Sequence, residues 1–261
     1  MKLTEEEKKA KVEPFRPIDD VFFEALAQNP KVCQEILRVI LEDDKLIVDE
    51  VITQCSEKNI YGRSVRLDAL CTLGTGEKCN IEIQRSDNDD YLRRARFNAS
   101  SITVKSSEVG SKFKDVVDVC IVYISQFDIF KQGRTIYHVD KVIRETGTVV
   151  DDGLKEVFVN TAVNDGSTIS ELMSCFLAKD VDNPKFPMLS SEVKRLKNTE
   201  GGLDSMCDLM EKYNQEAVDK KIIPAVKRLA KAGTSVKDLA EAFDKSTDEI
   251  EAILNSSETE N

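Results

Sequence analysis

Residues 66–84 read RLDALCTLGTGEKCNIEIQ and predict a β-hairpin. Two apolar runs of strand length flank the turn GTGEK at residues 74–78, whose glycines suit a tight connection. Each run carries one acid in its middle, Asp68 in the first and Glu82 in the second. Carboxylates inside such strands need either solvent or a cationic partner.

Side-chain alternation places Glu82 and Gln84 on one face of the second strand. If the strands pair with Asp68 near Glu82, the two carboxylates repel each other, which raises the pKa of at least one of them. A hard divalent cation would relieve this repulsion, because Mg²⁺ prefers carboxylate and water oxygens. The pattern is also that of an amphipathic hairpin with its polar face in solvent, and the residues alone leave both interpretations open.

The segments around the hairpin predict an α/β fold with a mixed sheet, because helices come first, then strands, one helix and further strands. VVDVCIVYI at residues 116–124 is a nearly continuous apolar run, which predicts a central strand buried on both faces. Asn29-Pro30 divides the first helical run into two helices. We expect helices over residues 19–40 and 90–106, and the other strands at residues 46–53, 135–143 and 154–161.

Beyond residue 168 the chain is expected to be helical, ending in three short helices over residues 222–255. Gly233 predicts a helix end, and S-x-x-D at 235–238 and S-x-x-E at 246–249 predict helix starts. These helices resemble a helix-turn-helix that would position the protein on DNA. However, the candidate recognition helix at 246–255 carries three acids and no base, which favours helical packing or a homodimer contact.

Composition narrows the chemistry available to the 261 residues. His138 is the only histidine and lies in an alternating strand pattern, so serine–histidine and cysteine–histidine catalysis is excluded unless His138 is the base. The net charge of −11 argues against a broadly basic surface for nucleic acid. Locally basic segments occur at residues 93–96 and 220–231. Any active site must therefore be built from carboxylates, amides, lysines and arginines.

Several features predict a cytoplasmic protein with no membrane partner. No apolar run approaches the roughly 20 residues of a membrane-spanning helix. The charged N-terminus, MKLTEEEKKAKVE at residues 1–13, lacks the apolar core of a secretory signal and is expected to be a frayed leader. The seven cysteines have no metal-ligand spacing and are expected to be reduced and buried, as in a reducing compartment.

The chain resembles the PD-(D/E)XK nuclease family transposases, also described as Rpn-type recombination-promoting nucleases. The pattern D-x(n)-E-x-K/Q across a hairpin is matched here by Asp68, Glu82 and Gln84. The matching stretches follow the order of the family over residues 15–180 and are IDDVFFEALAQNPKVCQEILRVIL, SVRLDALC, NIEIQ with DYLRRARF, YISQFDIFKQGRTIYH, VFVNT and ISELMSCFLA.

This resemblance implies a restriction-endonuclease-like core with a mixed central sheet flanked by helices, and metal-dependent cleavage of DNA with Mg²⁺ or Mn²⁺. The nuclease-like domain would span residues 15–180, followed by a helical linker region at 181–221 and a small helical tail at 222–256. A catalytically inactive interaction protein that keeps this fold is the alternative function.

The resemblance also implies a role for each matching residue. Asp68 and Glu82 would bind the metal, with the backbone carbonyl of Ile83 completing its shell. Gln84 would occupy the lysine position of the superfamily. The acid of the D-x-x-F helix would be Asp20, with Asp19 as the less favoured alternative, and Arg94 and Arg96 match basic positions on the next helix.

The chain also departs from the pattern of the family. Gln84 cannot offer positive charge to the phosphate or take a proton from water, as lysine could, which leaves charge stabilisation to the metal and to Arg94. Phe97 is the one member present of an aromatic pair, and Ala99 replaces a polar partner. These departures concern activity more than fold.

Overall fold

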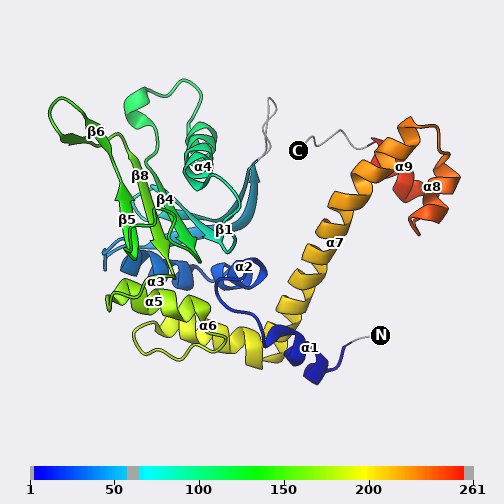
Figure 1. The fold of residues 1–261 in the computed structure, drawn as a ribbon, viewed down its shortest axis with the longest axis horizontal. Helices are drawn as coiled ribbons and strands as arrows, with labels where there is room; N and C mark the ends of the chain where they lie inside the picture. The colour runs from blue at the N-terminus through cyan, green and yellow to red at the C-terminus, as the bar shows by residue number, and fades with distance from the viewer. Residues whose placement is uncertain (1–2, 58–64, 256–261) are drawn as a thin grey trace. The chain divides into compact units, whose positions relative to one another are not determined.

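The computed structural model describes residues 3–57 and 65–255. Its main sheet is formed by β1 (Val48–Glu57), β2 (Val65–Leu73), β3 (Lys78–Gln84), β4 (Val119–Ser125), β5 (Ile136–Val139) and β8 (Leu154–Asn160). The strand order is β1-β2-β3-β4-β8-β5 (Figure 1). β2 pairs antiparallel with β1 and β3, β4 pairs parallel with β3 and β8, and β5 is antiparallel to β8. The predicted hairpin, β2–β3, thus lies within a mixed sheet.

The helices that accompany this sheet are α2 (Asp20–Ala27), α3 (Pro30–Ile40), α4 (Tyr91–Ser106), α5 (Thr168–Leu177) and α6 (Pro187–Asn198). Helix α4 covers one face of the sheet, and α2, α3, α5 and α6 lie on the other (Figure 1). Every residue of β4 is buried between these two layers, as its apolar sequence predicted. The α/β fold class is therefore confirmed.

The core on the α4 face is aromatic and aliphatic. Tyr91 and Ala95 of α4 are buried with Tyr123 of β4 and Phe158 of β8. The ring centroids of Tyr91 and Tyr123 are 5.7 Å apart, and those of Tyr123 and Phe158 are 5.9 Å apart, within the usual range of aromatic pairs. This packing fixes α4 across the sheet and sets where its arginines lie.

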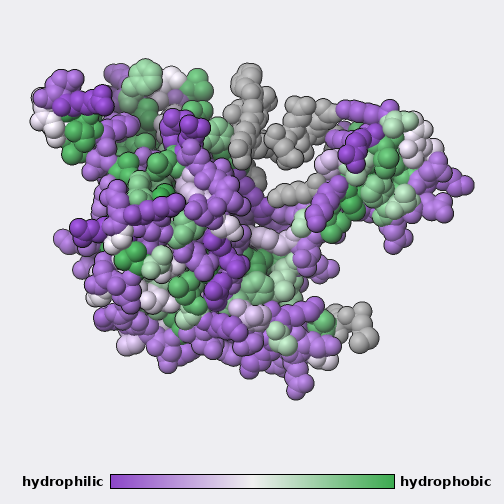
Figure 2. All heavy atoms as spheres, in the orientation of Figure 1, coloured by the Kyte–Doolittle hydropathy of each residue, from purple (hydrophilic) through white to green (hydrophobic). Residues whose placement is uncertain are grey.

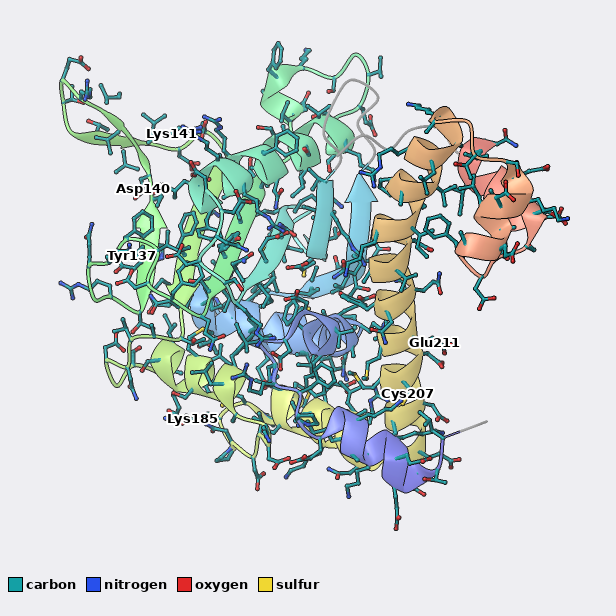
Figure 3. All side chains as sticks on the ribbon, turned by 45° about the vertical axis from the view of Figure 1, so that its right-hand side comes forward. Tyr137, Asp140, Lys141, Lys185, Cys207 and Glu211 are labelled. Atoms are coloured by element: carbon teal, nitrogen blue, oxygen red, sulfur yellow. The ribbon has the colours of Figure 1, made fainter. Side chains whose placement is uncertain are left out.

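Residues 135–143, predicted as one strand, form two. β5 stays in the main sheet, whereas β6 (Lys141–Ile143) leaves it and pairs with β7 (Thr148–Val150) as a separate two-stranded ribbon. Gly147 closes the ribbon at φ +72°, a conformation that suits glycine. Figure 3 shows Tyr137, Asp140 and Lys141 in order where the chain passes from β5 into the ribbon. Strand alternation alone does not reveal this change of sheet.

The N-terminal residues form a helix, α1 (Glu5–Val12), and the predicted frayed leader was wrong. The Thr4 side chain accepts a hydrogen bond from the Glu7 backbone, and the Glu7 carboxylate accepts one from the Thr4 backbone, which is a capping box. Val12 is fully buried and Lys8 is ion-paired with Asp204. The prediction failed because it weighed the charge of this segment and not its T-x-x-E pattern.

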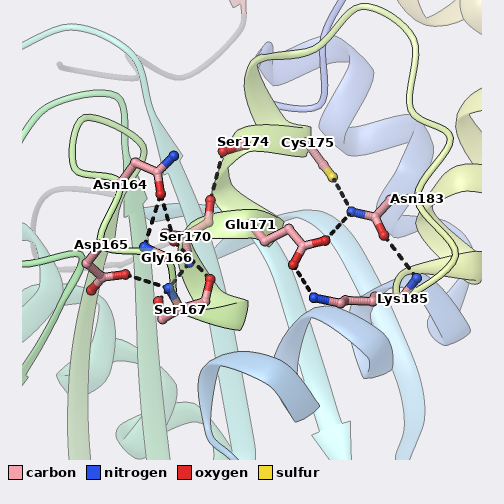
Figure 4. Close-up of polar contacts among 10 residues, drawn as sticks. All are labelled: Asn164, Asp165, Gly166, Ser167, Ser170, Glu171, Ser174, Cys175, Asn183 and Lys185. Carbon is pink, nitrogen blue, oxygen red and sulfur yellow. Dashed lines mark hydrogen bonds and ion pairs between the residues drawn. The ribbon is translucent and has the colours of Figure 1, made fainter.

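Polar contacts fix the start of α5 and the segment that follows it (Figure 4). The Ser167 side chain caps the helix by accepting a hydrogen bond from the Ser170 backbone at 3.1 Å. The Asp165 carboxylate accepts one from the Ser167 backbone at 3.0 Å, and contacts with Ser167 lower the pKa of Asp165. Glu171 binds both Asn183 and Lys185, which ties α5 to the chain leading into α6.

The chain divides into two compact units, Met1–Met206 and Cys207–Asn261. α7 (Glu200–Lys231) starts in the first unit and continues into the second as a single helix, although we predicted a separate short helix beginning near residue 222. Pro224 lies inside α7 without ending it. The helix continues because Ile222, Val226 and Ala230 extend one apolar stripe, which packs in the small core of the second unit.

The remaining tail helices are α8 (Val236–Ala242) and α9 (Thr247–Asn255). Ser235 and Ser246 accept hydrogen bonds from the backbones of Asp238 and Glu249, so both predicted helix starts are confirmed. Gly233 has φ +97° beyond the end of α7, as a helix stop requires. None of the helices that the structure describes is long and apolar enough to cross a membrane. In the view of Figure 2, hydrophilic residues cover most of the visible surface.

Candidate active site

The register of the hairpin sets Asp68 beside Glu82. β2 and β3 pair Ala69 with Ile81 and Leu70 with Asn80, so the next pair along brings the two acids together. The Asp68 backbone N–H donates to Glu82 Oε1 at 3.4 Å, and the Ile83 N–H donates to Asp68 Oδ2 at 2.9 Å. Each carboxylate is therefore held by the backbone of the opposite strand.

Glu82 is fully buried on the α4 face of β3. The Asn80 side-chain amide donates to its Oε1 at 2.9 Å, and Arg94 Nη2 of α4 lies 3.4 Å from its Oε2. Burial raises the pKa of Glu82, while Arg94 and Asn80 act in the opposite direction. Glu82 is thus a carboxylate enclosed in protein whose principal counter-charge is Arg94.

Of the two acids, Asp68 has the more strongly raised pKa. Burial raises its pKa well above the ordinary value for aspartate, and the neighbouring charge of Glu82 raises it further. The Ile83 N–H and the positive charge of Arg94 oppose this rise. A pair of enclosed acids with one arginine between two carboxylates retains unneutralised negative charge, which a cation would neutralise.

A polar pocket of about 440 Å³ opens beside this pair, at the ends of β3 and β4, and we call it the strand-end pocket. The carboxyl ends of parallel strands are a common place for ligands in α/β proteins. Asp68 and Gln84 line the pocket, whereas Glu82 lies behind it. The lining residues are Asp20, Asp68, Ile83, Gln84, Arg85, Ser86, Arg94 and Gln126.

Gln84 is fixed by hydrogen bonds at both ends of its amide. Its Nε2 donates to the Ser86 carbonyl oxygen at 2.8 Å, and the Tyr123 hydroxyl donates to its Oε1 at 3.4 Å. The Tyr91 hydroxyl also donates to the Ser86 carbonyl, at 2.6 Å, which fixes the chain after β3. Gln84 is therefore a neutral, oriented part of the pocket wall.

The two acids at the start of α2 occupy different environments. Asp20 lines the strand-end pocket, and its pKa is raised by desolvation against the opposing charges of Arg85 and Arg94. Asp19 is buried and lies outside the lining; its carboxylate contacts Arg16 and Arg85. Of the two alternatives considered from the sequence, Asp20 is the one that the fold brings to the pocket.

Residues 18–169, more than half of the chain, match the family model described as PD-(D/E)XK nuclease family transposase. The chain belongs to this family. Every residue that lines the strand-end pocket falls within the matched range. No curated protein and no solved structure matches the chain.

In a nuclease family, the question is whether the oxygen ligands near the strand-end pocket suit a divalent cation. Among residues 3–57 and 65–255, no three side chains of the His, Cys, Asp and Glu types gather as a metal cluster. Mg²⁺ does not require such a cluster, because it often binds one or two carboxylates and keeps water and phosphate oxygens as its other ligands. Asp68 and Glu82, as adjacent hard oxygen donors with raised pKa values, fit that mode.

Arg96, which the resemblance singled out, and His138, expected to be an ordinary strand residue, lie elsewhere. Arg96 is exposed on α4 and lines a separate hollow of about 650 Å³ together with Arg93 and Lys141. His138 is exposed on β5 and lines a hollow that includes the β2–β3 turn, at the other end of β3 from Gln84. The fold therefore brings neither residue to the strand-end pocket.

Sequence reasoning missed Arg85, Ser86 and Gln126 in the pocket lining. Arg85 and Ser86 directly follow the E-x-Q motif, and Gln126 directly follows β4. The signal that could have found them is topological, since residues just after parallel strands meet at one edge of the sheet. Using that signal requires knowing that β3 and β4 are parallel neighbours.

Proposed function

We propose that this protein is a metal-dependent DNA endonuclease of the transposase type, which hydrolyses phosphodiester bonds at the strand-end pocket. The observation that carries the proposal is the adjacent, enclosed pair Asp68 and Glu82 beside Arg94, in a chain of the nuclease family. Such a pair is costly to bury without a counter-charge, and a hydrolytic metal site gives it a use.

In this proposal Asp68 and Glu82 hold Mg²⁺ or Mn²⁺, with the backbone carbonyl of Ile83 as a further ligand. When bound, the cation would lower the pKa of an attacking water and polarise the scissile phosphate. Because the Ile83 N–H holds Asp68 Oδ2, the orientation of the Asp68 carboxylate is set before any ligand arrives. Preorganised donors of this kind need little rearrangement during the reaction.

The other pocket residues have distinct proposed roles. Arg94 balances the charge of Glu82 and contributes positive charge near the phosphate. Gln84 orients the pocket wall through Ser86 and Tyr123, because its neutral amide cannot replace the charge of a lysine. Asp20, whose raised pKa brings it closer to neutral pH, can hold or accept a proton at the edge of the pocket.

DNA is the substrate class that membership of a nuclease family supports. The cytoplasmic location and the homodimer contact stay predictions. The division into a nuclease-like domain at residues 15–180, a linker region at 181–221 and a tail at 222–256 also stays a prediction.

A second candidate function is a catalytically inactive interaction protein with the same fold. Two observations favour it. Both ends of the Gln84 amide are engaged in structural hydrogen bonds, and Arg94 already lies against the Glu82 oxygen that a metal would need. A protein that had lost turnover could keep both contacts and the fold around them.

Plasmid nicking separates the two functions. Supercoiled plasmid is incubated with the parent protein in Mg²⁺, in Mn²⁺ and in EDTA, and we expect nicking with either cation and none in EDTA. Asp68→Asn and Glu82→Gln should each abolish nicking, because a neutral amide is a poor ligand for a hard cation. No nicking by the parent protein with either cation would favour the inactive interaction protein.

Glu156→Gln is the matched control for these variants. Glu156 is a half-buried acid whose pKa is also raised by burial, but it lies on β8 outside the strand-end pocket. The Glu156→Gln variant should nick plasmid at the rate of the parent protein. Nicking that persists in Asp68→Asn, or that is lost equally in Glu156→Gln, would count against the assignment of the site.

A further inference from the structure

Arg85 is the pocket residue whose role the proposed mechanism leaves open. It directly follows Gln84, where β3 ends, and it lines the strand-end pocket. Its side chain is 48% exposed, and its Nη1 lies 2.8 Å from Asp19 Oδ1. A cationic side chain is therefore held at the pocket, one residue beyond the position where the superfamily has lysine.

The Asp19 carboxylate, the ion-pair partner of Arg85, is itself held in place. It is buried at the start of α2, with only 6% of its surface exposed. The Arg16 backbone N–H donates to its Oδ2 at 2.7 Å, and Arg16 Nη2 lies 3.4 Å from its Oδ1. The carboxylate that holds Arg85 is thus itself held by the backbone, which restricts where the guanidinium can lie.

The charges around the pocket leave Arg85 suited to an anionic ligand. Arg94, the other arginine of the pocket lining, lies against Glu82 of the proposed metal pair. Arg85 contacts Asp19 through one nitrogen, and a guanidinium has five N–H donors in a planar fork that matches phosphate. The positive charge of Arg85 also opposes the rise in the pKa of Asp20, another residue of the pocket lining.

The Arg85 side chain is about half exposed, so water screens its attraction to the buried Asp19 carboxylate, which Arg16 also contacts. A lysine at Gln84 would have presented one positive charge to the substrate, and Gln84 presents none. The position, charge and donor geometry of Arg85 fill that gap.

Building on the proposed function, we propose that Arg85 binds a DNA phosphate at the strand-end pocket and supplies the positive charge that Gln84 lacks. Asp19 acts as a positioning residue, because it touches Arg85 and lies outside the pocket lining. The ligand group is a phosphodiester of duplex DNA. No bond forms or breaks at Arg85, which acts by charge and hydrogen bonding alone.

The test measures DNA binding without metal, so it does not depend on turnover. A fluorescein-labelled DNA duplex is titrated with each protein in EDTA across a salt series, and binding is followed by fluorescence anisotropy. Arg85→Gln should weaken binding about tenfold, the effect of losing one charge-assisted hydrogen-bonded contact. The slope of log K against log salt should fall by about 0.9, the value for one phosphate contact.

Arg195→Gln is the matched control, because Arg195 is likewise a half-exposed arginine paired with a buried acid, in a different place. Arg195 on α6 lies 2.7 Å from Glu192, with side-chain exposures of 45% and 8%, against 48% and 9% for Arg85 and Asp19. The Arg195→Gln variant removes the same charge and also breaks a pair with a buried acid. Its DNA affinity and salt slope should match those of the parent protein. Arg85→Lys keeps the charge and should retain the salt slope while losing part of the affinity.

The proposal is overturned if the parent protein does not bind the duplex in EDTA, or if Arg85→Gln and Arg195→Gln bind alike. It is supported if Arg85→Gln alone loses affinity and salt slope while its melting temperature stays that of the parent protein. Nicking in Mg²⁺ is recorded separately. A parent protein that binds through Arg85 but never nicks would contradict the proposed endonuclease function and leave phosphate binding standing.

Discussion

The register of the β2–β3 pair brings Asp68 and Glu82 together, which destabilises the metal-free protein and forms the proposed metal site. Each acid is acceptable in a strand that faces solvent, but Glu82 is fully buried beneath α4 and Asp68 is half-buried beside it at the edge of the strand-end pocket. Burial raises the pKa of both acids, and the charge of Glu82 raises the pKa of Asp68 further. The protein without metal therefore carries an electrostatic penalty that one substitution can remove.

We predict that Asp68→Asn stabilises the metal-free protein at neutral pH and abolishes its response to divalent cation. A raised native pKa means that the native state binds protons more tightly than the unfolded state, so stability falls as pH rises. The penalty should be absent below about pH 4, the ordinary aspartate value, and grow toward the raised pKa of Asp68. Each 1 kcal/mol relieved should raise Tm by about 2–4 °C.

The measurement is thermal unfolding in EDTA and in Mg²⁺ or Mn²⁺ across pH. At a hundredfold excess over Kd, the cation should stabilise the parent protein by about 2.7 kcal/mol and so raise its Tm, because the cation binds only the native site. Glu156→Gln should respond like the parent protein. Equal cation shifts in the parent protein and Asp68→Asn would mean that the hairpin acids are simply solvated or otherwise paired, as the competing interpretation of the hairpin holds.

The sequence predicted which acids would meet, but not how deeply they would lie. Strand alternation gives the face of Glu82 and Gln84, and the strand pairing then follows from the short turn. Alternation says nothing about α4, the helix that covers this face. It therefore did not predict that Arg94 contacts Glu82, or that Glu82 lies outside the pocket lining. Arg85 was missed for a related reason, since its partner Asp19 is 66 positions earlier in the chain.

At the scale of elements, β3 and β4 connect fold and site. Their parallel pairing aligns the residues after Gln84 with those after Ser125, which is why Arg85 and Gln126 share one pocket. The buried run of β4 was predictable because its sequence is apolar throughout. The β6–β7 ribbon was not, because residues 135–143 alternate as one strand would and only tertiary pairing divides them.

The junction between α6 and α7 gives a prediction at this scale. A Cβ added at Gly202 would lie 2.1 Å from the Arg195 carbonyl oxygen and 2.7 Å from Leu196 Cα, contacts too short for any side chain. Because both atoms belong to the backbone of α6, the helices would have to move apart. We expect Gly202→Ala to lower the free energy of unfolding by about 1–3 kcal/mol, as overpacking does.

Gly201 is the matched control for this prediction. It precedes Gly202 in the same helical turn, and a Cβ added there meets nothing within 4 Å. Gly201→Ala should therefore be neutral or stabilising by up to about 1 kcal/mol, because alanine favours a helix over glycine. Urea unfolding of both variants gives the comparison. If Gly202→Ala were as stable as Gly201→Ala, the close approach of α7 to α6 at Gly202 would be wrong.

For the whole molecule, the sequence predicted a core followed by helices but not the place where the compact units divide. Helical periodicity reports that a segment is a helix, and α7 is one helix across the division at Met206. The apolar residues Leu203 and Met206 in its first turns are buried, whereas the polar residues that follow are mostly exposed. Burial, which decides where a unit ends, depends on contacts with segments distant in sequence.

We therefore predict that residues 1–206 fold without the remainder of the chain, and that residues 1–200 are markedly less stable. The shorter chain lacks Leu203 and Met206, which are 1% and 0% exposed, and the Asp204 partner of Lys8. Deleting one large buried side chain costs about 2–5 kcal/mol. Circular dichroism and urea unfolding of the two truncations give the comparison. Equal stabilities would show that the start of α7 adds nothing to the first unit, and an unfolded 1–206 would show that the unit needs residues 207–261.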